Sequence, residues 1–164
     1  MEEQDILRVL SEEFDNKLNL IRDLVPREAQ FPDAPNKIKV AIGMRRSGKT
    51  YFLYQQILKL MSDGVSKTRI LYLNFEDDRL LPLTQKKLAK LIEGFYAIYP
   101  ENNNVKCYLF LDEIQNVEGW PMVVRRFHDT KNVELFLTGS SAKLLSKEIA
   151  TSLRGRSLAV EIWP

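Results

Sequence analysis

The strongest chemical signal in the sequence is a glycine-rich turn that ends in a lysine and a hydroxyl residue. Residues 43–50 read Gly-Met-Arg-Arg-Ser-Gly-Lys-Thr, which matches G-x-x-x-x-G-K-[ST], and they directly follow the apolar run 38–42. Glycines let such a loop curl so that successive N–H groups point at phosphate oxygens, and the helix expected to begin near Gly48 adds the positive end of its dipole. The pattern predicts a site for a nucleoside triphosphate, with Lys49 at the β- and γ-phosphates and Thr50 at Mg²⁺. The residues predicted to bind nucleotide are Gly43, Met44, Arg45, Arg46, Ser47, Gly48, Lys49, Thr50 and Tyr51.

Two adjacent acids follow a second apolar run. Tyr108-Leu109-Phe110-Leu111 leads directly into Asp112 and Glu113. An aspartate at this position can hold Mg²⁺ opposite Thr50, and the adjoining glutamate can orient and deprotonate the attacking water. The simpler interpretation is that both acids begin a polar loop, but the phosphate-binding loop earlier in the chain favours the second half of an ATP site.

Hydroxyl residues follow a third apolar run. Leu135-Phe136-Leu137 precedes Thr138, Gly139, Ser140 and Ser141. If the strands pair in parallel, Thr138 lies level with Asp112, and a hydroxyl there or at Ser140 would hydrogen-bond the γ-phosphate or the attacking water. Ser140 or Ser141 would equally serve as the N-cap of the next helix. Both interpretations stay open, and they can hold for different residues.

The elements that must position these side chains alternate between strand and helix. This order predicts a parallel sheet with crossover helices, in which ligands bind at the carboxyl ends of the strands. Continuously apolar strands are typical of a sheet covered on both faces. The predicted strands are 38–42, 69–75, 107–112, 133–138 and 157–162, and the predicted helices are 48–61, 84–98, 120–129 and 143–153.

An amphipathic helix precedes this alternating part. Apolar residues recur at helical spacing through 6–25, and Pro26, Pro32 and Pro35 then interrupt the pattern. We therefore divide the chain into an N-terminal helix and connecting arm, residues 1–37, and a core, residues 38–164. The helix either covers the core or docks a partner, and the sequence leaves both open.

Composition places the chain in a broad class. With 164 residues, of which 45% are hydrophobic and 28% charged, it is long enough for one substantial core. The formal charge of +2 is far from that of a dedicated nucleic-acid binder. The single cysteine, Cys107, excludes an internal disulfide, and with the single histidine, His128, it is too little for a zinc site. No apolar run approaches the ~20 residues of a membrane span, so we expect a cytoplasmic protein without a membrane segment.

Five motifs in order resemble the prokaryotic AAA-type ATPase domain of the AAA+ superfamily, which is often followed by a conserved C-terminal domain of unknown function. They are 43–50, 74–79, 111–120, 137–142 and 153–156. The resemblance implies a Walker A motif at 43–50, a Walker B motif at 108–113 and a sensor-1 region at 138–141. It also implies a three-layer α/β P-loop fold with a parallel five-stranded sheet in the order 5-1-4-3-2, and ATP or ADP with Mg²⁺ as ligands.

The sequence ends at Pro164, directly after the last predicted strand. We therefore expect a core that lacks the helical lid of such ATPases, and weak or absent turnover by this stretch alone. Arg154 and Arg156 lie near the end of the last predicted helix. There they would act as an arginine finger toward a neighbouring subunit, or simply form a solvated helix end.

We expect an ATPase that hydrolyses ATP with Mg²⁺ to drive a conformational change, with Lys49, Glu113, Thr138 or Ser140, and the two arginines as catalytic residues. The alternative is a nucleotide-gated switch or interaction module with negligible hydrolysis. Association with DNA is a further alternative, favoured only by the mildly basic charge and by Arg45 and Arg46, which either touch phosphates or face another partner. The partner is therefore ATP, with a protein partner or self-association as further expectations.

Overall fold

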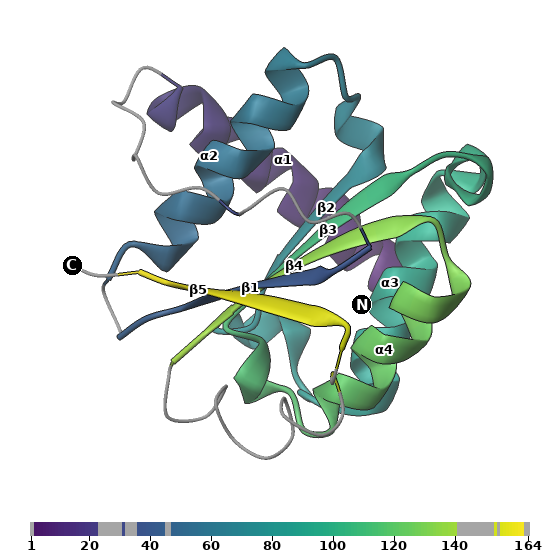
Figure 1. Ribbon diagram of the computed structural model, residues 1–164. Coiled ribbons are helices and arrows are strands. Elements are labelled where there is room, and N and C mark those ends of the chain that lie inside the picture. The colour runs from purple at the N-terminus through teal and green to yellow at the C-terminus, as the bar shows by residue number, and fades with distance from the viewer. Residues whose placement is uncertain are drawn as a thin grey trace.

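A parallel five-stranded sheet forms the centre of the computed structural model, which describes residues 2–22, 31, 36–44, 47–140, 153 and 155–162 (Figure 1). The strand order is β2-β3-β4-β1-β5, which is the expected order 5-1-4-3-2 read from the other edge. The predicted α/β class and topology are therefore confirmed. The strands are β1 (Ile38–Ile42), β2 (Ile70–Asn74), β3 (Cys107–Asp112), β4 (Val133–Gly139) and β5 (Ser157–Glu161).

The register of the sheet brings the polar strand ends together. Leu111 of β3 pairs with Leu137 of β4, so the next residues, Asp112 and Thr138, lie side by side. On the other side of β4, Thr138 pairs with Ala41 of β1, just before the glycine-rich turn. Because all strands are parallel, these polar residues meet at one edge of the sheet.

Helices cover both faces of the sheet and make three layers (Figure 1). Helix α2 packs on one face through Leu53, Tyr54 and Ile57, which contact Phe110 and Phe136. Helices α3 and α4 belong to a second core on the other face. The bounds of these helices are α2 (Lys49–Ser62), α3 (Gln85–Ile98) and α4 (Trp120–Thr130), and short 3₁₀ turns η1 (Lys67–Arg69), η2 (Asp78–Leu80), η3 (Pro100–Asn104) and η4 (Ile114–Asn116) lie in the connections.

Helix α1 (Glu3–Ile21) passes the edge strand β2 and contributes to both cores. Ile6 and Leu7 pack with α3, whereas Leu18 packs with α2. An added Cβ on Gly94 of α3 would lie only 3.1 Å from the Leu7 side chain, so glycine allows the close approach of the two helices. The edge strand is thereby covered rather than left open to pairing with another chain.

The N-terminal helix begins before Ile6, the first apolar residue used to predict it, since its first turn is polar and acidic. Acidic residues are favourable at the positive end of the helix dipole. The predicted end of this helix, most of the predicted arm, and the predicted helix 143–153 lie outside the described residues. Within the described part of the chain, no helix combines the length and apolar character needed to cross a membrane.

Candidate active site

The glycine-rich turn follows β1, and neighbouring atoms surround its first residue closely. A Cβ added to Gly43 would lie 2.6 Å from the carbonyl oxygen of Ile162 and 2.6 Å from Ser47 Oγ, so no larger residue fits there. Gly48 precedes α2 with a φ of 90°, a left-handed conformation that favours glycine. The predicted loop residues Arg45 and Arg46 lie outside the described residues. The glycines thus shape the turn in the way that a phosphate-binding loop requires.

Lys49 is folded back into this turn. Its side chain is buried, with 4% of the residue exposed, and Nζ donates to the carbonyl oxygen of Gly43 at 2.6 Å. The same ammonium lies 3.0 Å from Oε1 of Glu113. The structure therefore joins the two halves of the predicted site through a buried ion pair.

Three hydroxyl groups converge on the buried carboxylate of Asp112. Thr50 Oγ1 and Tyr72 OH both donate to Oδ2 at 2.6 Å, and Thr138 Oγ1 donates to Oδ1. The contact with Thr50 was expected for a shared metal site. Tyr72 was not anticipated, because a tyrosine in an apolar strand carries no sequence signal for a polar site.

Glu113 adopts a left-handed backbone conformation with φ 56° and ψ 48°. This conformation is uncommon for a residue other than glycine, and such outliers often occur at functional sites. Its backbone N–H donates to Thr138 Oγ1 at 2.8 Å, and its Oε2 accepts from Gln115 Nε2 at 2.6 Å. Gln115 was also missed at the level of sequence, although its place two residues after the glutamate, in a 3₁₀ turn, explains the contact.

The two candidate sensor hydroxyls differ in their surroundings. Thr138 is fully buried, and its hydroxyl gives its hydrogen to Asp112 while it accepts from the backbone of Glu113. Ser140 lines a cleft together with Lys49 and Glu113. Only Ser140 of this pair therefore lies where a ligand in the cleft can reach its side chain. Ser141, the alternative helix cap, lies outside the described residues.

Two adjoining clefts flank the ion pair between Lys49 and Glu113, and Glu76 lines both. Their volumes are about 560 and 540 Å³, within the range of small-molecule sites. Ile21, Tyr51 and Tyr54 also line the first cleft, and Gln115, Asn116 and Ser140 also line the second. Of the predicted nucleotide-binding residues, Gly48, Lys49, Thr50 and Tyr51 line the first cleft, whereas Met44 is exposed at 65%.

The donor atoms at this site suit Mg²⁺ with a nucleotide. The hydroxyl of Thr50 and the carboxylate of Asp112 are hard oxygen ligands within hydrogen-bond distance of each other, and Mg²⁺ is commonly held by one or two such groups together with substrate phosphates. No group of three or more His, Cys, Asp or Glu side chains gathers as a metal cage among the described residues. The residues thus fit a metal that arrives with phosphate rather than a resident cluster.

Most side chains of the charged segment after β2, residues 76–79, hold the fold together rather than line the clefts. Asp77 Oδ1 accepts from the backbone N–H of Arg79, and the Arg79 guanidinium forms two 2.7 Å hydrogen bonds to Glu13 of α1. Glu76 is the exception, since it lines both clefts. The segment therefore joins α1 to the core and contributes one carboxylate to the site.

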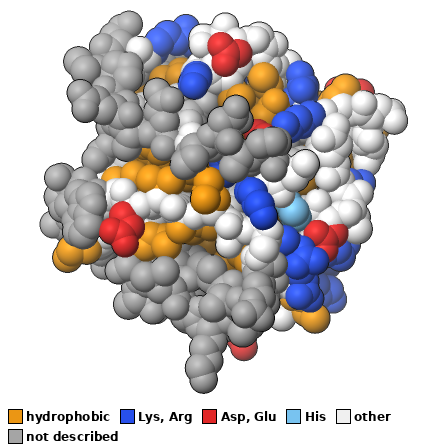
Figure 2. Space-filling model, viewed as in Figure 1, with side chains coloured by type: hydrophobic (Ala, Val, Ile, Leu, Met, Phe, Trp, Pro, Cys, Tyr) orange, Lys and Arg blue, Asp and Glu red, His pale blue; other side chains and the backbone are white. Residues whose placement is uncertain are grey.

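Arg156 lies away from this cluster. It directly precedes β5, at the amino edge of the sheet, and its Nε donates to Asp129 Oδ1 at 3.1 Å. Figure 2 shows Lys and Arg side chains on this side of the molecule, around the only histidine. Arg154, its predicted companion, lies outside the described residues. Within one chain, the structure therefore does not bring Arg156 to the Lys49–Glu113 pair.

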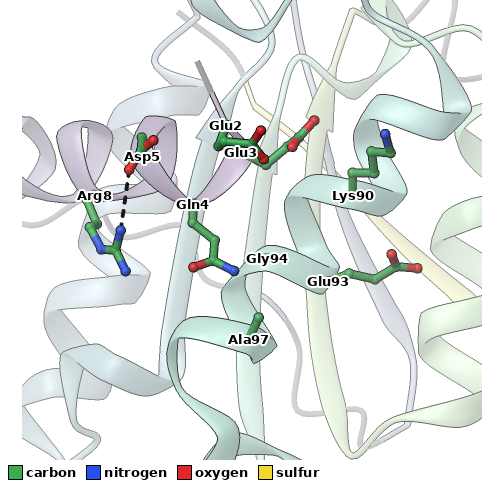
Figure 3. A pocket seen from close by; sticks show the side chains of 9 residues that line it. All are labelled: Glu2, Glu3, Gln4, Asp5, Arg8, Lys90, Glu93, Gly94 and Ala97. Carbon is green, nitrogen blue, oxygen red and sulfur yellow. Dashed lines mark hydrogen bonds and ion pairs between the residues drawn. The ribbon is translucent and has the colours of Figure 1, made fainter.

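A further hollow of about 590 Å³ lies where α1 begins beside α3 (Figure 3). It is lined by surface carboxylates together with Arg8 and Lys90, and Arg8 pairs with Asp5 at 3.4 Å. Glycine-rich backbone and buried polar side chains of the kind found around Lys49 do not line it. We assign the chemistry to the clefts beside Lys49, not to this hollow.

Comparison with known sequences finds matches over most of the chain. A family model described as an AAA domain matches residues 35–164. An uncharacterized protein of Methanocaldococcus jannaschii is 47% identical over 141 residues, which cover 86% of this chain and 30% of that protein. An uncharacterized protein of Haemophilus influenzae is 38% identical over 138 residues, which cover 82% of this chain and 33% of that protein. The chain thus spans about a third of the length of these relatives.

Solved structures share the fold. A DNA polymerase III gamma subunit-related protein of Thermotoga maritima gives a TM-score of 0.54 at 9% identity, covering 90% of this chain and 45% of that one. A DNA replication initiation factor gives a TM-score of 0.52 at 18% identity, and the match covers 95% of this chain and 46% of that one. PCH-2 of C. elegans gives a TM-score of 0.51 at 15% identity, and the match covers 96% of this chain and 42% of that one. At these identities the likeness concerns the fold alone.

Proposed function

We propose that this chain, which belongs to the AAA domain family and is therefore an ATP-binding domain of the AAA type, hydrolyses ATP with Mg²⁺ to drive a conformational change. One observation carries the proposal. The ammonium of Lys49 lies between the glycine turn and Glu113, and Thr50, the next residue, donates to the buried carboxylate of Asp112 at 2.6 Å, so groups for phosphate, metal and water lie together.

Lys49 and Glu113 have linked roles in this proposal. Incoming phosphates compete with Glu113 for the ammonium, so the ion pair opens when ATP occupies the loop. The freed carboxylate then accepts a proton from the water that attacks the γ-phosphate. Gln115 keeps Oε2 of Glu113 in place during this exchange, since its contact does not involve Lys49.

Thr50 and Asp112 would hold Mg²⁺, which supplies neutralisation of charge on the β- and γ-phosphates when bound. Thr138 orients Asp112 and the backbone of Glu113 rather than contacting ATP, because its hydroxyl is already engaged by both. Ser140 is the better candidate for contact with the γ-phosphate or the water. Tyr51 lines the first cleft beside Lys49 and is the proposed contact for the rest of the nucleotide.

A nucleotide-gated switch with negligible hydrolysis is the second candidate. One observation favours it: both carboxylate oxygens of Glu113 are engaged, Oε1 by Lys49 and Oε2 by Gln115. A base held in this way is released only if phosphate displaces Lys49. Turnover at saturating ATP separates the candidates, because a switch would bind ATP with little release of phosphate.

Lys49→Ala tests the site itself. We expect the variant to lose ATP binding in calorimetric titration while its circular dichroism spectrum stays that of the folded parent, although loss of the buried ion pair with Glu113 lowers its unfolding temperature. Lys59→Ala is the matched control, since Lys59 is exposed on the same helix, α2. If Lys49→Ala binds ATP as tightly as the parent with Mg²⁺ present, the glycine turn is not the site.

A further inference from the structure

Tyr72 reaches the proposed metal site from the edge strand. In the register of the sheet, Tyr72 pairs with Phe110, and it is Asn74 that pairs with Asp112. The Tyr72 side chain therefore reaches diagonally along the sheet toward its carboxyl edge, where its hydroxyl donates to Asp112 Oδ2 at 2.6 Å. This oxygen is the one that also accepts from Thr50.

Two other aromatic rings hold Tyr72 in this orientation. Phe14 of α1 stacks on the Tyr72 ring with centroids 5.1 Å apart and an interplanar angle of 11°. Tyr54 of α2 meets the ring edge-on at 5.1 Å, and Phe14 and Tyr54 also contact each other at 5.7 Å. Three elements thus fix one phenol, and such aromatic pairs favour a defined geometry.

Resting on the proposed function, we propose that Tyr72 is a positioning residue that orients Asp112 for Mg²⁺ and so sets the metal requirement of ATP binding. Asp112 Oδ1 is fixed by Thr138, whereas Oδ2 lies between Thr50 and Tyr72. Without the Tyr72 hydroxyl, Oδ2 keeps Thr50 as its only described donor, and Thr50 is itself the group that turns to the metal. Mutation of a residue that hydrogen-bonds a metal-binding carboxylate typically lowers metal affinity or activity by about 10–100-fold.

The phenol also connects the site to α1. Phe14 lies in a helix that precedes residues 35–164, the region matched by the AAA domain. The stack between Phe14 and Tyr72 is thus a direct path of contact from this helix to Asp112.

Tyr72→Phe tests the proposal, because it removes one oxygen and keeps the ring stacked on Phe14. The dissociation constant of ATP is measured by calorimetry over a series of MgCl₂ concentrations and in excess EDTA. We expect the half-saturating Mg²⁺ concentration to rise about tenfold, with unchanged ATP affinity in EDTA. Tyr108→Phe is the matched control, since Tyr108 is a buried tyrosine of the neighbouring strand β3 in the same core, and it should follow the parental curve.

Two results would overturn the positioning role. One is a half-saturating Mg²⁺ concentration equal to or below that of the parent. The other is an equal loss of ATP affinity with and without Mg²⁺, which marks a purely structural contribution. If the parent itself shows no Mg²⁺-dependent ATP binding, the proposed function fails instead, so the two failures are distinguishable.

Discussion

Two carboxylates with opposite surroundings define the chemistry at the scale of single residues. Asp112 is fully buried and, among the described residues, its carboxylate accepts hydrogen bonds from three hydroxyl groups, whereas Glu113 pairs with the ammonium of Lys49. Hydroxyl donors leave the charge of Asp112 available to a cation. The ammonium of Lys49, in contrast, neutralises Glu113 until an anion replaces it. In the proposed function, binding of phosphate would therefore act on Glu113 more directly than on Asp112.

Glu113→Gln separates binding from hydrolysis. We expect ATP to bind at least as tightly as to the parent, because the amide competes less for Lys49, while phosphate release falls at least ~100-fold, because the amide cannot accept the proton of the attacking water. A malachite-green phosphate assay at saturating ATP measures the effect. Glu118→Gln is the control, since Glu118 is an exposed acid of the same loop. Parental turnover in Glu113→Gln would remove the role of general base.

The residues predicted from the sequence are those with a fixed place along a motif. Lys49, Thr50, Asp112 and Glu113 lie at or after the ends of strands that a parallel sheet must bring together, and two contacts join them, Thr50 with Asp112 at 2.6 Å and Lys49 with Glu113 at 3.0 Å. Tyr72 lies in a strand with no polar motif, and its contact depends on a side chain that reaches diagonally across the register. Such a contact follows from three-dimensional geometry and cannot be read from spacing.

Helix α1 is the element that the sequence left undecided between covering the core and docking a partner. Its buried residues pack against α2 and α3, so covering the core is its role in this structure. Arg79 strengthens the attachment and lowers the pKa of both Glu13 and Asp77 through hydrogen bonds. A carboxyl group whose pKa is lowered by folding stabilises the folded state at pH values above its pKa in the unfolded chain. This contribution is lost as the pH falls through the lowered pKa of the folded state.

Phe14→Ala measures how firmly α1 is held. We expect the free energy of unfolding to fall by about 2 kcal/mol, because the variant loses a half-buried ring that contacts Tyr54 and Tyr72. Leu20→Ala on the same helix is the control, since Leu20 is 81% exposed and its loss should cost less than about 0.5 kcal/mol. Urea denaturation gives both values. Equal effects of the two variants would show that α1 is not attached through Phe14.

The five strands and the helices α2, α3 and α4 were predicted to within one residue at each end, whereas α1 begins three residues before its predicted start. Apolar runs bounded by turn residues fix their limits, and parallel pairing follows from the alternation of strand and helix. The docking of α1 across the edge strand was not predictable in the same way. It depends on close approach at Gly94 and on ion pairs such as Lys67–Asp15, which join residues far apart in the sequence.

The parallel sheet gives the whole molecule two functionally different edges. The carboxyl edge carries the site, and the amino edge carries Arg156 with its partner Asp129. Arg156 cannot contact the Lys49–Glu113 pair of its own chain, because the two edges lie at opposite ends of the strands. A role in turnover therefore requires a second copy whose amino edge faces the cleft, as an arginine finger acting in trans would need.

Mixing variants tests this assembly. Arg156→Ala keeps an intact site but offers no finger, and Glu113→Gln offers the finger but has no base, so a mixture should recover turnover that each variant lacks alone. The specific activity of the parent should also rise with protein concentration, because the finger acts only after subunits meet. Arg126→Ala is the control, since Arg126 is an exposed arginine of α4 that pairs with Glu93 and should behave as the parent. Phosphate release that is independent of concentration, with Arg156→Ala fully active alone, would leave Arg156 as the partner of Asp129 and no more.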